Sequence, residues 1–199
     1  MDEIATSLAG QFIAFDGPDG SGKSTQISRF VQRFRNQGLV VREVREPGGS
    51  FIGEQIRNIL LDPANEGMTM PCEMLLYMAS RAQLVEQEIK PAMARGELVV
   101  ADRFVSATLA YQGKAGGLPV EWIQQVAEVA VASCWPSLTI ILDVDDKTAA
   151  GRLNPLLDRM ELKGKEFHAK VREGFLEQAQ TWPHRYSVID ASVDENTVE

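Results

Sequence analysis

A stretch near the N-terminus has the residue types and spacing of a phosphate-binding loop. It reads Gly17-Pro18-Asp19-Gly20-Ser21-Gly22-Lys23-Ser24 and fits the pattern G-x-x-x-x-G-K-[ST] at every position. The glycines allow backbone N–H groups to converge on phosphate oxygens, because side chains there would block the approach. Lys23 would add a positive charge between the β- and γ-phosphates, and the Ser24 hydroxyl would ligate Mg²⁺. The stretch therefore predicts a nucleotide-binding loop.

A pair of charged residues that could take part in chemistry, Asp102-Arg103, follows an apolar run at residues 98–101. In a phosphate-binding-loop fold the carboxyl ends of such strands face the phosphates. There Asp102 would hold Mg²⁺ through water, and Arg103 would clamp a second phosphate with its bidentate fork. The pair suits transfer between two phosphorylated molecules better than hydrolysis. The sequence contains no Asn-Lys-x-Asp motif, which a guanine-reading GTPase would show.

The elements that must position these residues alternate between apolar β-like runs and helical segments. This alternation predicts an α/β domain with a parallel sheet covered on both faces. The expected strands cover residues 11–16, 39–44, 98–102, 138–144 and 186–189, and the clearest helices cover 23–37, 71–95 and 119–133. Residues 154–165 are the least apolar stretch and are expected to form a mobile surface segment. The absence of repeats and linker composition predicts one domain over residues 1–199.

Composition excludes several classes of function. The chain has 199 residues, 44% of them hydrophobic, and a formal net charge of −8, so a general nucleic-acid-binding surface is not expected. No apolar run approaches the ~18 residues that a membrane helix needs, and the acidic first ten residues do not fit a signal peptide. Cys72 and Cys134 are too few for a disulfide framework and are expected to be buried thiols in a reducing cytoplasm.

Beyond the loop, several separated motifs occur in the order found in one family, and the sequence resembles a thymidylate (dTMP) kinase over about residues 11–192. The motifs are Phe15-Asp16-Gly17 through Thr25-Gln26, Arg45-Glu46-Pro47-Gly48-Gly49, Tyr77-Met78-Ala79-Ser80-Arg81, Asp102-Arg103 with Tyr111-Gln112-Gly113, Asp158-Arg159-Met160-Glu161 and Ile189-Asp190-Ala191. The resemblance implies a three-layer sandwich of the P-loop NTPase type. It also implies transfer of a phosphoryl group from ATP to dTMP with Mg²⁺, in a cytoplasmic homodimer.

The resemblance also implies roles for particular residues. On the ATP side, residues 17–25 would hold the phosphates, and Arg152 would pack on adenine. Around dTMP, Arg57 and Arg103 would grip the phosphate, and Asp19 would meet the sugar 3′-hydroxyl. Tyr77 would stack on thymine, Arg81 would bond a thymine carbonyl, Tyr111 would fill the space of a ribose 2′-hydroxyl, and Gln112 would lie beside the base. Tyr77 and Arg81 are four residues apart, so on one helix they share a face.

Two departures from the family pattern bear on the chemistry. Position 77 is Tyr where members usually have Phe, so its hydroxyl needs a polar partner. Members also supply an additional arginine to the transferring phosphoryl group, from the phosphate-binding loop or from a lid. Here the loop position is Gly20, and Arg159 is the only arginine between residues 153 and 166 of the expected short lid. We therefore expect Arg159, ahead of Lys163 or Lys165, to supply this charge.

Two alternatives stay open from the sequence. One is another P-loop kinase that acts on a different nucleoside or nucleoside monophosphate, because two arginines at an acceptor phosphate do not read the base. The other is a non-catalytic nucleotide-binding paralogue, which the thin lid favours. The retained Lys23, Arg57, Asp102 and Arg103 weigh against it.

Overall fold

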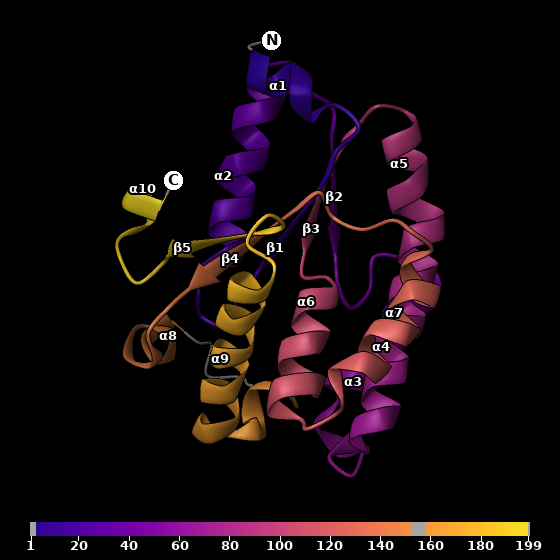
Figure 1. Ribbon diagram of the computed structural model, residues 1–199, viewed down its shortest axis with the longest axis vertical. Coiled ribbons are helices and arrows are strands. Elements are labelled where there is room, and N and C mark those ends of the chain that lie inside the picture. Colours follow the sequence, from indigo (N-terminus) through magenta and orange to yellow (C-terminus); the bar gives the residue numbers. More distant parts are fainter. Residues whose placement is uncertain (1–2, 153–157, 199) are drawn as a thin grey trace.

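A five-stranded parallel sheet forms the centre of the computed structural model, which describes residues 3–152 and 158–198 (Figure 1). The strand order is β2-β3-β1-β4-β5, and every pairing between neighbours is parallel. The strands are β1 (Phe12–Asp16), β2 (Val41–Arg45), β3 (Leu98–Asp102), β4 (Leu138–Asp143) and β5 (Tyr186–Asp190). The predicted α/β class with a parallel sheet is confirmed.

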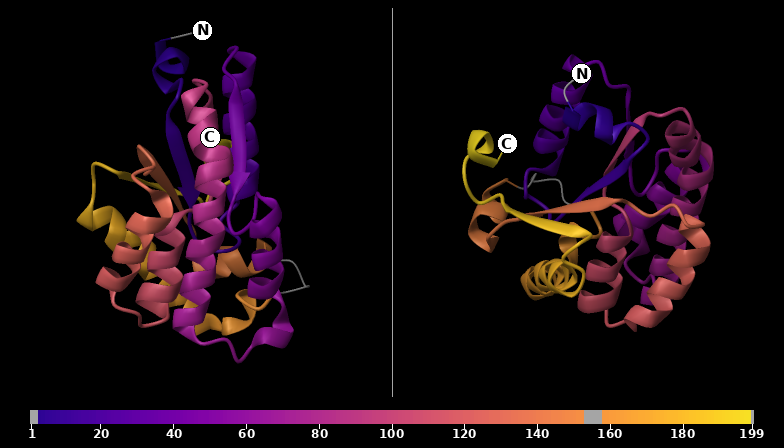
Figure 2. Two further views of the ribbon diagram at one scale, coloured as in Figure 1. Left: turned by 90° about the vertical axis from the view of Figure 1, so that its right-hand side faces the viewer. Right: turned by 45° about the horizontal axis from the view of Figure 1, so that its top comes forward.

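Helices cover both faces of the sheet (Figure 2). One face carries α1 and α2, and the other carries the larger set that includes α4, α6, α7 and α9. The α-helices are α1 (Glu3–Leu8), α2 (Lys23–Asn36), α3 (Phe51–Leu61), α4 (Met70–Leu84), α5 (Lys90–Ala94), α6 (Val105–Thr108), α7 (Val120–Val131), α8 (Asp146–Arg152), α9 (Lys165–Thr181) and α10 (Glu195–Val198). Short 3₁₀ turns are η1 (Pro63–Asn65) and η4 (Glu161–Lys163), and π-helical segments are η2 (Val85–Ile89) and η3 (Leu109–Ala115).

The two faces of the sheet are built from alternate residues of its central strands. In β1, Phe12 and Ala14 belong to the core under α4 and α7, whereas Ile13 and Phe15 belong to the core under α2. Successive side chains of a strand point to opposite faces, so a strand that is covered on both sides must be apolar throughout. This explains why β1 is a continuous apolar run that ends in Asp16.

Several details differ from the sequence predictions. The short helix α1 was not predicted, and the expected helix over residues 71–95 is divided into α4, the π-helical η2 and α5. The prediction that both cysteines are buried is wrong for Cys72, which is exposed on the first turn of α4, and right for Cys134. The prediction rested on the small number of cysteines, which does not determine on which side of a helix a cysteine lies.

The sheet brings the candidate functional residues to one edge because all its strands run in the same direction. Phe15 pairs with Asp102 in the register of β1 and β3, and Arg45 pairs with the same Asp102 in the register of β2 and β3. The chain therefore leaves three neighbouring strands side by side, into the loops that begin at Gly17, Glu46 and Arg103. This is the edge at which open parallel sheets bind ligands.

Candidate active site

The phosphate-binding loop passes close to backbone on both sides, and its glycines make this possible. Gly17 has φ 138°, and a Cβ built there would lie 2.3 Å from the Leu142 carbonyl oxygen. Gly20 has φ 76°, and a Cβ there would lie 2.6 Å from the carbonyl oxygen of Ala149 in α8. The absence of an arginine at position 20 therefore has a steric reason as well as a chemical one, because any side chain would have to displace α8.

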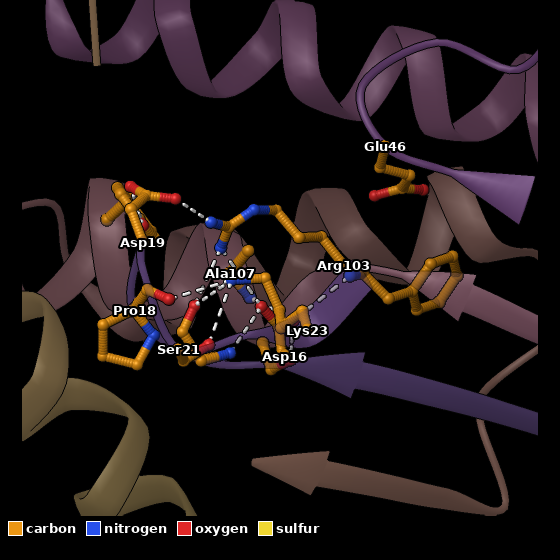
Figure 3. A network of polar contacts seen from close by, with 12 residues as sticks. Asp16, Pro18, Asp19, Ser21, Lys23, Glu46, Arg103 and Ala107 are labelled. Carbon is orange, nitrogen blue, oxygen red and sulfur yellow. Dashed lines mark hydrogen bonds and ion pairs between the residues drawn. The ribbon is translucent and has the colours of Figure 1, made fainter. Parts of the chain in front are cut away.

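Lys23 lies at the start of α2 with its ammonium group inside the loop. Its Nζ donates hydrogen bonds to the carbonyl oxygens of Gly17 at 3.0 Å and Pro18 at 2.9 Å (Figure 3). Burial, and then the nearby Arg103 charge, lower the pKa of Lys23 from 10.5 to about 8. The Lys23 ammonium group is therefore in position to contact an anion, such as a phosphate, bound within the loop.

Ser24 and Asp102 line the same two hollows at the carboxyl ends of β1 and β3. A hydroxyl and a carboxylate are hard oxygen ligands of the kind Mg²⁺ prefers, and Mg²⁺ usually takes its remaining ligands from phosphates and water. Within residues 3–152 and 158–198, no group of three or more His, Cys, Asp and Glu side chains forms a metal cage. The pair fits a metal that arrives with a nucleotide.

Arg103, Asp19 and Tyr111 form a compact cluster although they come from three different elements. The Arg103 guanidinium donates to the Gly17 carbonyl oxygen at 3.1 Å and pairs with Asp19 (Figure 3). It also lies 5.2 Å from the centre of the Tyr111 ring, a distance typical of a cation–π contact. The Tyr111 hydroxyl donates to Asp19 at 2.8 Å. Burial raises the pKa of Asp19, but Arg103, Lys23 and Tyr111 outweigh it and hold the carboxyl ionised.

Asp16 is a fully buried carboxylate that joins the phosphate-binding loop to the loop after β3. It accepts hydrogen bonds from the backbone N–H groups of Phe104 at 3.2 Å and Ala107 at 3.1 Å, and from the Ser106 hydroxyl. These contacts satisfy free N–H groups at the start of α6. Asp16 therefore fixes the position of the segment that begins with Arg103, whose φ of 71° is unusual for a residue other than glycine.

A cavity of about 370 Å³ opens beside this cluster. Six of the seven residues predicted to bind the acceptor line it, and the seventh, Arg81, does not. The six are Asp19, Arg57, Tyr77, Arg103, Tyr111 and Gln112. The fold therefore gathers the loops after β1 and β3 and residues of α3, α4 and η3 around one hollow. Arg57 is tied down within it, since its Nη1 donates to the Pro47 carbonyl oxygen at 2.8 Å.

Arg81 lies directly behind the cavity in a buried ion pair. It is 1% exposed, its Nε donates to both carboxylate oxygens of Glu46 at 3.0 and 2.8 Å, and its Nη1 donates to the Thr108 hydroxyl at 3.2 Å. Glu46 and Thr108 both line the cavity. Burial raises the pKa of Glu46 to about 7 although Arg81 opposes this. The sequence analysis assigned no role to Glu46. The only feature that could have indicated one is its position in the motif Arg45-Glu46-Pro47-Gly48-Gly49.

Arg152 lines a different hollow from the cavity of about 370 Å³. It lines a second hollow of about 350 Å³ together with Lys23, Ser24 and Thr25. Its guanidinium donates to the carbonyl oxygens of Ala191 at 2.8 Å and Val193 at 3.1 Å, so α8 is joined to the segment after β5. The two hollows adjoin at Asp19, Ser24, Asp102 and Arg103, which line both of them, as direct transfer between two bound molecules requires.

Arg159, expected to supply charge to the transferring group, lies in a buried contact with Glu73 and Leu60. It is 5% exposed, its Nη1 lies 2.6 Å from a carboxylate oxygen of Glu73, and its Nε donates to the Leu60 carbonyl oxygen at 2.6 Å. Residues 153–157 of the expected lid lie outside the described residues. Of the part that is described, Arg159 and Met160 are buried, so the expectation of a surface segment is wrong there. The sequence analysis missed Glu73, since a lone acid in an apolar helix carries no motif.

Comparison with known proteins narrows the open alternatives. The family model described as Thymidylate kinase matches residues 15–199. The chain belongs to the thymidylate kinase family. A thymidylate kinase of Symbiobacterium thermophilum is 48% identical over 182 residues, which are 91% of this chain and 85% of the relative. One from Lactobacillus delbrueckii subsp. bulgaricus is 44% identical over 194 residues, covering 94% and 91%.

A solved structure of a thymidylate kinase family member agrees with the fold. The crystal structure of thymidylate kinase from Ehrlichia chaffeensis superposes with a TM-score of 0.76 at 32% identity, covering 96% of this chain and 94% of that one. The predicted P-loop kinase fold, with its sheet between two helical layers, is thereby confirmed for this thymidylate kinase family member. Among its described residues, no helix is long and apolar enough to cross a membrane.

Proposed function

We propose that this protein transfers the γ-phosphoryl group of ATP to dTMP and forms dTDP and ADP. Its membership of the thymidylate kinase family supports this proposal. The observation that carries it is that Asp102 and Arg103 line both of two adjoining hollows, one of which is also lined by Lys23 and Arg152 and the other by Arg57, Tyr77 and Tyr111. Phosphoryl transfer requires chiefly positioning and charge stabilisation, and this arrangement supplies both.

The phosphate-binding loop and the pair Asp102-Arg103 have different roles in this proposal. Loop N–H groups and Lys23 hold the donor phosphates, and Arg103 with Arg57 holds the acceptor phosphate in line with them. Ser24 and Asp102 would hold Mg²⁺, which supplies charge neutralisation between the phosphates when it is bound. Asp16 fixes Arg103 from behind, so the cation is in place before the substrates meet.

The acceptor cavity favours a deoxynucleotide with a planar base. Tyr77 offers an aromatic ring for stacking on the base, and Tyr111 closes the sugar side while its hydroxyl is held by Asp19. A ribose 2′-hydroxyl would meet the Tyr111 ring. Arg81 does not line the cavity, so it would influence a bound base by holding Glu46 and Thr108, which do line it.

A coupled ADP-release assay tests the proposal. With ATP and Mg²⁺, we expect rapid release with dTMP, weak release with the ribonucleotide of thymine, and none without an acceptor. ADP release without an acceptor would make the protein an ATPase. Measurable binding of ATP and dTMP without any product would make it a non-catalytic module, and equal rates with dUMP or dGMP would make it a kinase of another specificity.

We also propose that the protein is a homodimer that works in the cytoplasm, in the synthesis of dTTP. Three neighbouring helices, α3, α4 and α7, carry large exposed apolar side chains, such as Phe51 at 81%, Leu75 at 53% and Trp122 at 58% (Figure 1). Large exposed apolar side chains on neighbouring helices are typical of protein interfaces. Two unpaired cysteines fit a reducing compartment. Sedimentation equilibrium should give twice the chain mass, and Leu75→Glu should give a monomer.

A further inference from the structure

A buried carboxylate on the first turn of α4 receives hydrogen bonds from two other parts of the chain. Glu73 is 0% exposed. One of its carboxylate oxygens, Oε1, accepts from the Gln112 Nε2 at 2.7 Å and from the Lys163 Nζ at 3.0 Å. The other, Oε2, lies 2.6 Å from Arg159 Nη1 and 2.9 Å from Lys163 Nζ. Such a fully engaged carboxylate has no freedom to turn.

Glu73 lies on the face of α4 that is directed at the acceptor cavity. Glu73, Tyr77 and Arg81 follow one another at intervals of four residues, a spacing that places side chains one above the other on a helix. Tyr77 lines the cavity, and Arg81 lies behind it. Glu73 does not line it but contacts Gln112, which does. Glu73 can therefore act on a bound acceptor through Gln112.

The chemistry of a carboxylate decides which way the Gln112 carboxamide faces. An ionised carboxylate only accepts hydrogen bonds, so the amide nitrogen must turn toward Glu73 and the amide oxygen away from it. The opposite orientation would place three oxygens together in a site that is 1% exposed at Gln112. Although burial raises it, hydrogen bonds from Lys163, Gln112 and Arg159 hold the pKa of the Glu73 carboxyl below its usual range. The cavity wall thus presents an acceptor oxygen.

We propose that Glu73 is a positioning residue that sets the base specificity of the acceptor site by fixing the orientation of the Gln112 carboxamide. This inference rests on the proposed function. An acceptor oxygen in the wall fits a pyrimidine whose ring nitrogen carries a hydrogen, as the imide N3–H of thymine does. Cytosine presents an unprotonated N3, which would face the oxygen with no hydrogen between them.

The two cations make this arrangement stable and connect it to the end of the lid. A buried carboxylate without partners is strongly unfavourable, and Arg159 and Lys163 compensate its charge. Both belong to the segment from Asp158 to Lys163, which lies against the end of α3 through the Arg159 contact with Leu60. The carboxylate that orients Gln112 is therefore also the anchor of this segment on the acceptor side.

The test compares dTMP with dCMP as acceptors for the full-length protein. For the wild type, we expect kcat/KM for dTMP to exceed that for dCMP by a large factor. Glu73→Gln removes the charge that fixes the amide, and this ratio should fall at least tenfold. Glu73→Asp keeps a group that only accepts hydrogen bonds, and it should retain most of the discrimination. Glu128→Gln, on the exposed side of α7, is the matched control and should leave the ratio unchanged.

A double-mutant cycle tests whether Glu73 acts through Gln112. In a Gln112→Ala background, Glu73→Gln should no longer alter the ratio of dTMP to dCMP. If Glu73→Gln lowers both rates equally and leaves the ratio unchanged, its role is structural and the inference is wrong. If Glu73→Gln fails to fold, Glu73→Gln with Lys163→Met is compared with Lys163→Met alone, since this pair removes one excess cation. A wild-type protein that does not phosphorylate dTMP would overturn the proposed function instead.

Discussion

The Tyr111 hydroxyl donates a hydrogen bond of 2.8 Å to Asp19, a residue of the phosphate-binding loop. Asp19 also pairs with Arg103, whose guanidinium lies over the Tyr111 ring. The loop that would hold the donor phosphates is thus connected directly to Tyr111, the residue that would close the sugar side of the proposed acceptor cavity. A substitution at Tyr111 should therefore shift Asp19 and Arg103, in addition to changing the preference for deoxyribose over ribose.

Tyr111→Phe should weaken the acceptor site without opening it. The ring stays, but Asp19 loses a hydrogen bond worth about 1 kcal/mol, so kcat/KM for dTMP should fall roughly fivefold. Tyr111→Ala should in addition allow a ribose to enter, and the preference for dTMP over the ribonucleotide should fall at least tenfold. Steady-state kinetics with both nucleotides measure this. An unchanged sugar preference in Tyr111→Ala would contradict the assignment.

The lowered pKa of Lys23 predicts a pH dependence of ATP binding. Above about pH 8 the free protein loses the Lys23 proton and with it part of the attraction for phosphate. We therefore expect kcat/KM for ATP to fall as the pH rises through about 8, and Lys23→Ala to lack this descending limb. A flat profile up to pH 9.5 in the wild type would show that Lys23 stays charged.

The same shift predicts the opposite sign for stability. The folded-state pKa of Lys23 is lowered from 10.5 to about 8, so between these pH values the unfolded chain binds more protons than the folded one. The contribution of Lys23 to the free energy of unfolding should therefore rise with pH over this window and stay constant below it. Urea unfolding of the wild type and of Lys23→Met at pH 7, 8.5 and 10 measures it. A difference between the two proteins that does not change with pH would contradict the shift.

Glu46→Gln should be strongly destabilising because it leaves the Arg81 guanidinium buried without its anion. Removal of one partner of a buried ion pair costs about 3–5 kcal/mol, which corresponds to a loss of roughly 10 °C in the melting temperature of a chain of this size. Glu43→Gln is the matched control, since its pair with Arg35 is 44% exposed on both sides and should cost less than about 1 kcal/mol. Thermal unfolding followed by circular dichroism compares them. Similar losses in both variants would show that the Glu46–Arg81 pair contributes no more than a surface pair.

Arg159→Ala separates two roles of one side chain. Its contact with Glu73 predicts a loss of up to about 3 kcal/mol in the free energy of unfolding, because among the described residues Lys163 is then the one cation left in contact with Glu73. If Arg159 also supplies charge to the transferring phosphoryl group, kcat should fall at least a hundredfold, as removal of such a group typically does. Turnover is measured well below the melting temperature, with Arg159→Lys as the variant that keeps the charge. A folded Arg159→Ala protein with normal kcat would leave only the anchoring role.

Much of this fold follows from short stretches of sequence considered singly. Continuous apolar runs identify β1 and β3, and a run interrupted only by Thr139 identifies β4, because a strand that is covered on both faces has no polar side. The phosphate-binding loop is identified by glycines that its backbone needs at Gly17 and Gly20. These features depend on local geometry, and the residues that carry them are close together in the chain.

The partners of the buried charges were decided by the tertiary structure alone. Glu46 meets Arg81 from 35 residues away, and Glu73 meets Lys163 from 90 residues away. Neither pair can be found from the sequence, because an ion pair depends on where two elements pack and leaves no pattern along the chain. The sequence itself determined which groups follow the strands at the carboxyl edge of the sheet. The packing of α4 against η3 and the segment from Asp158 to Lys163 decided which carboxylates hold the surrounding side chains in place.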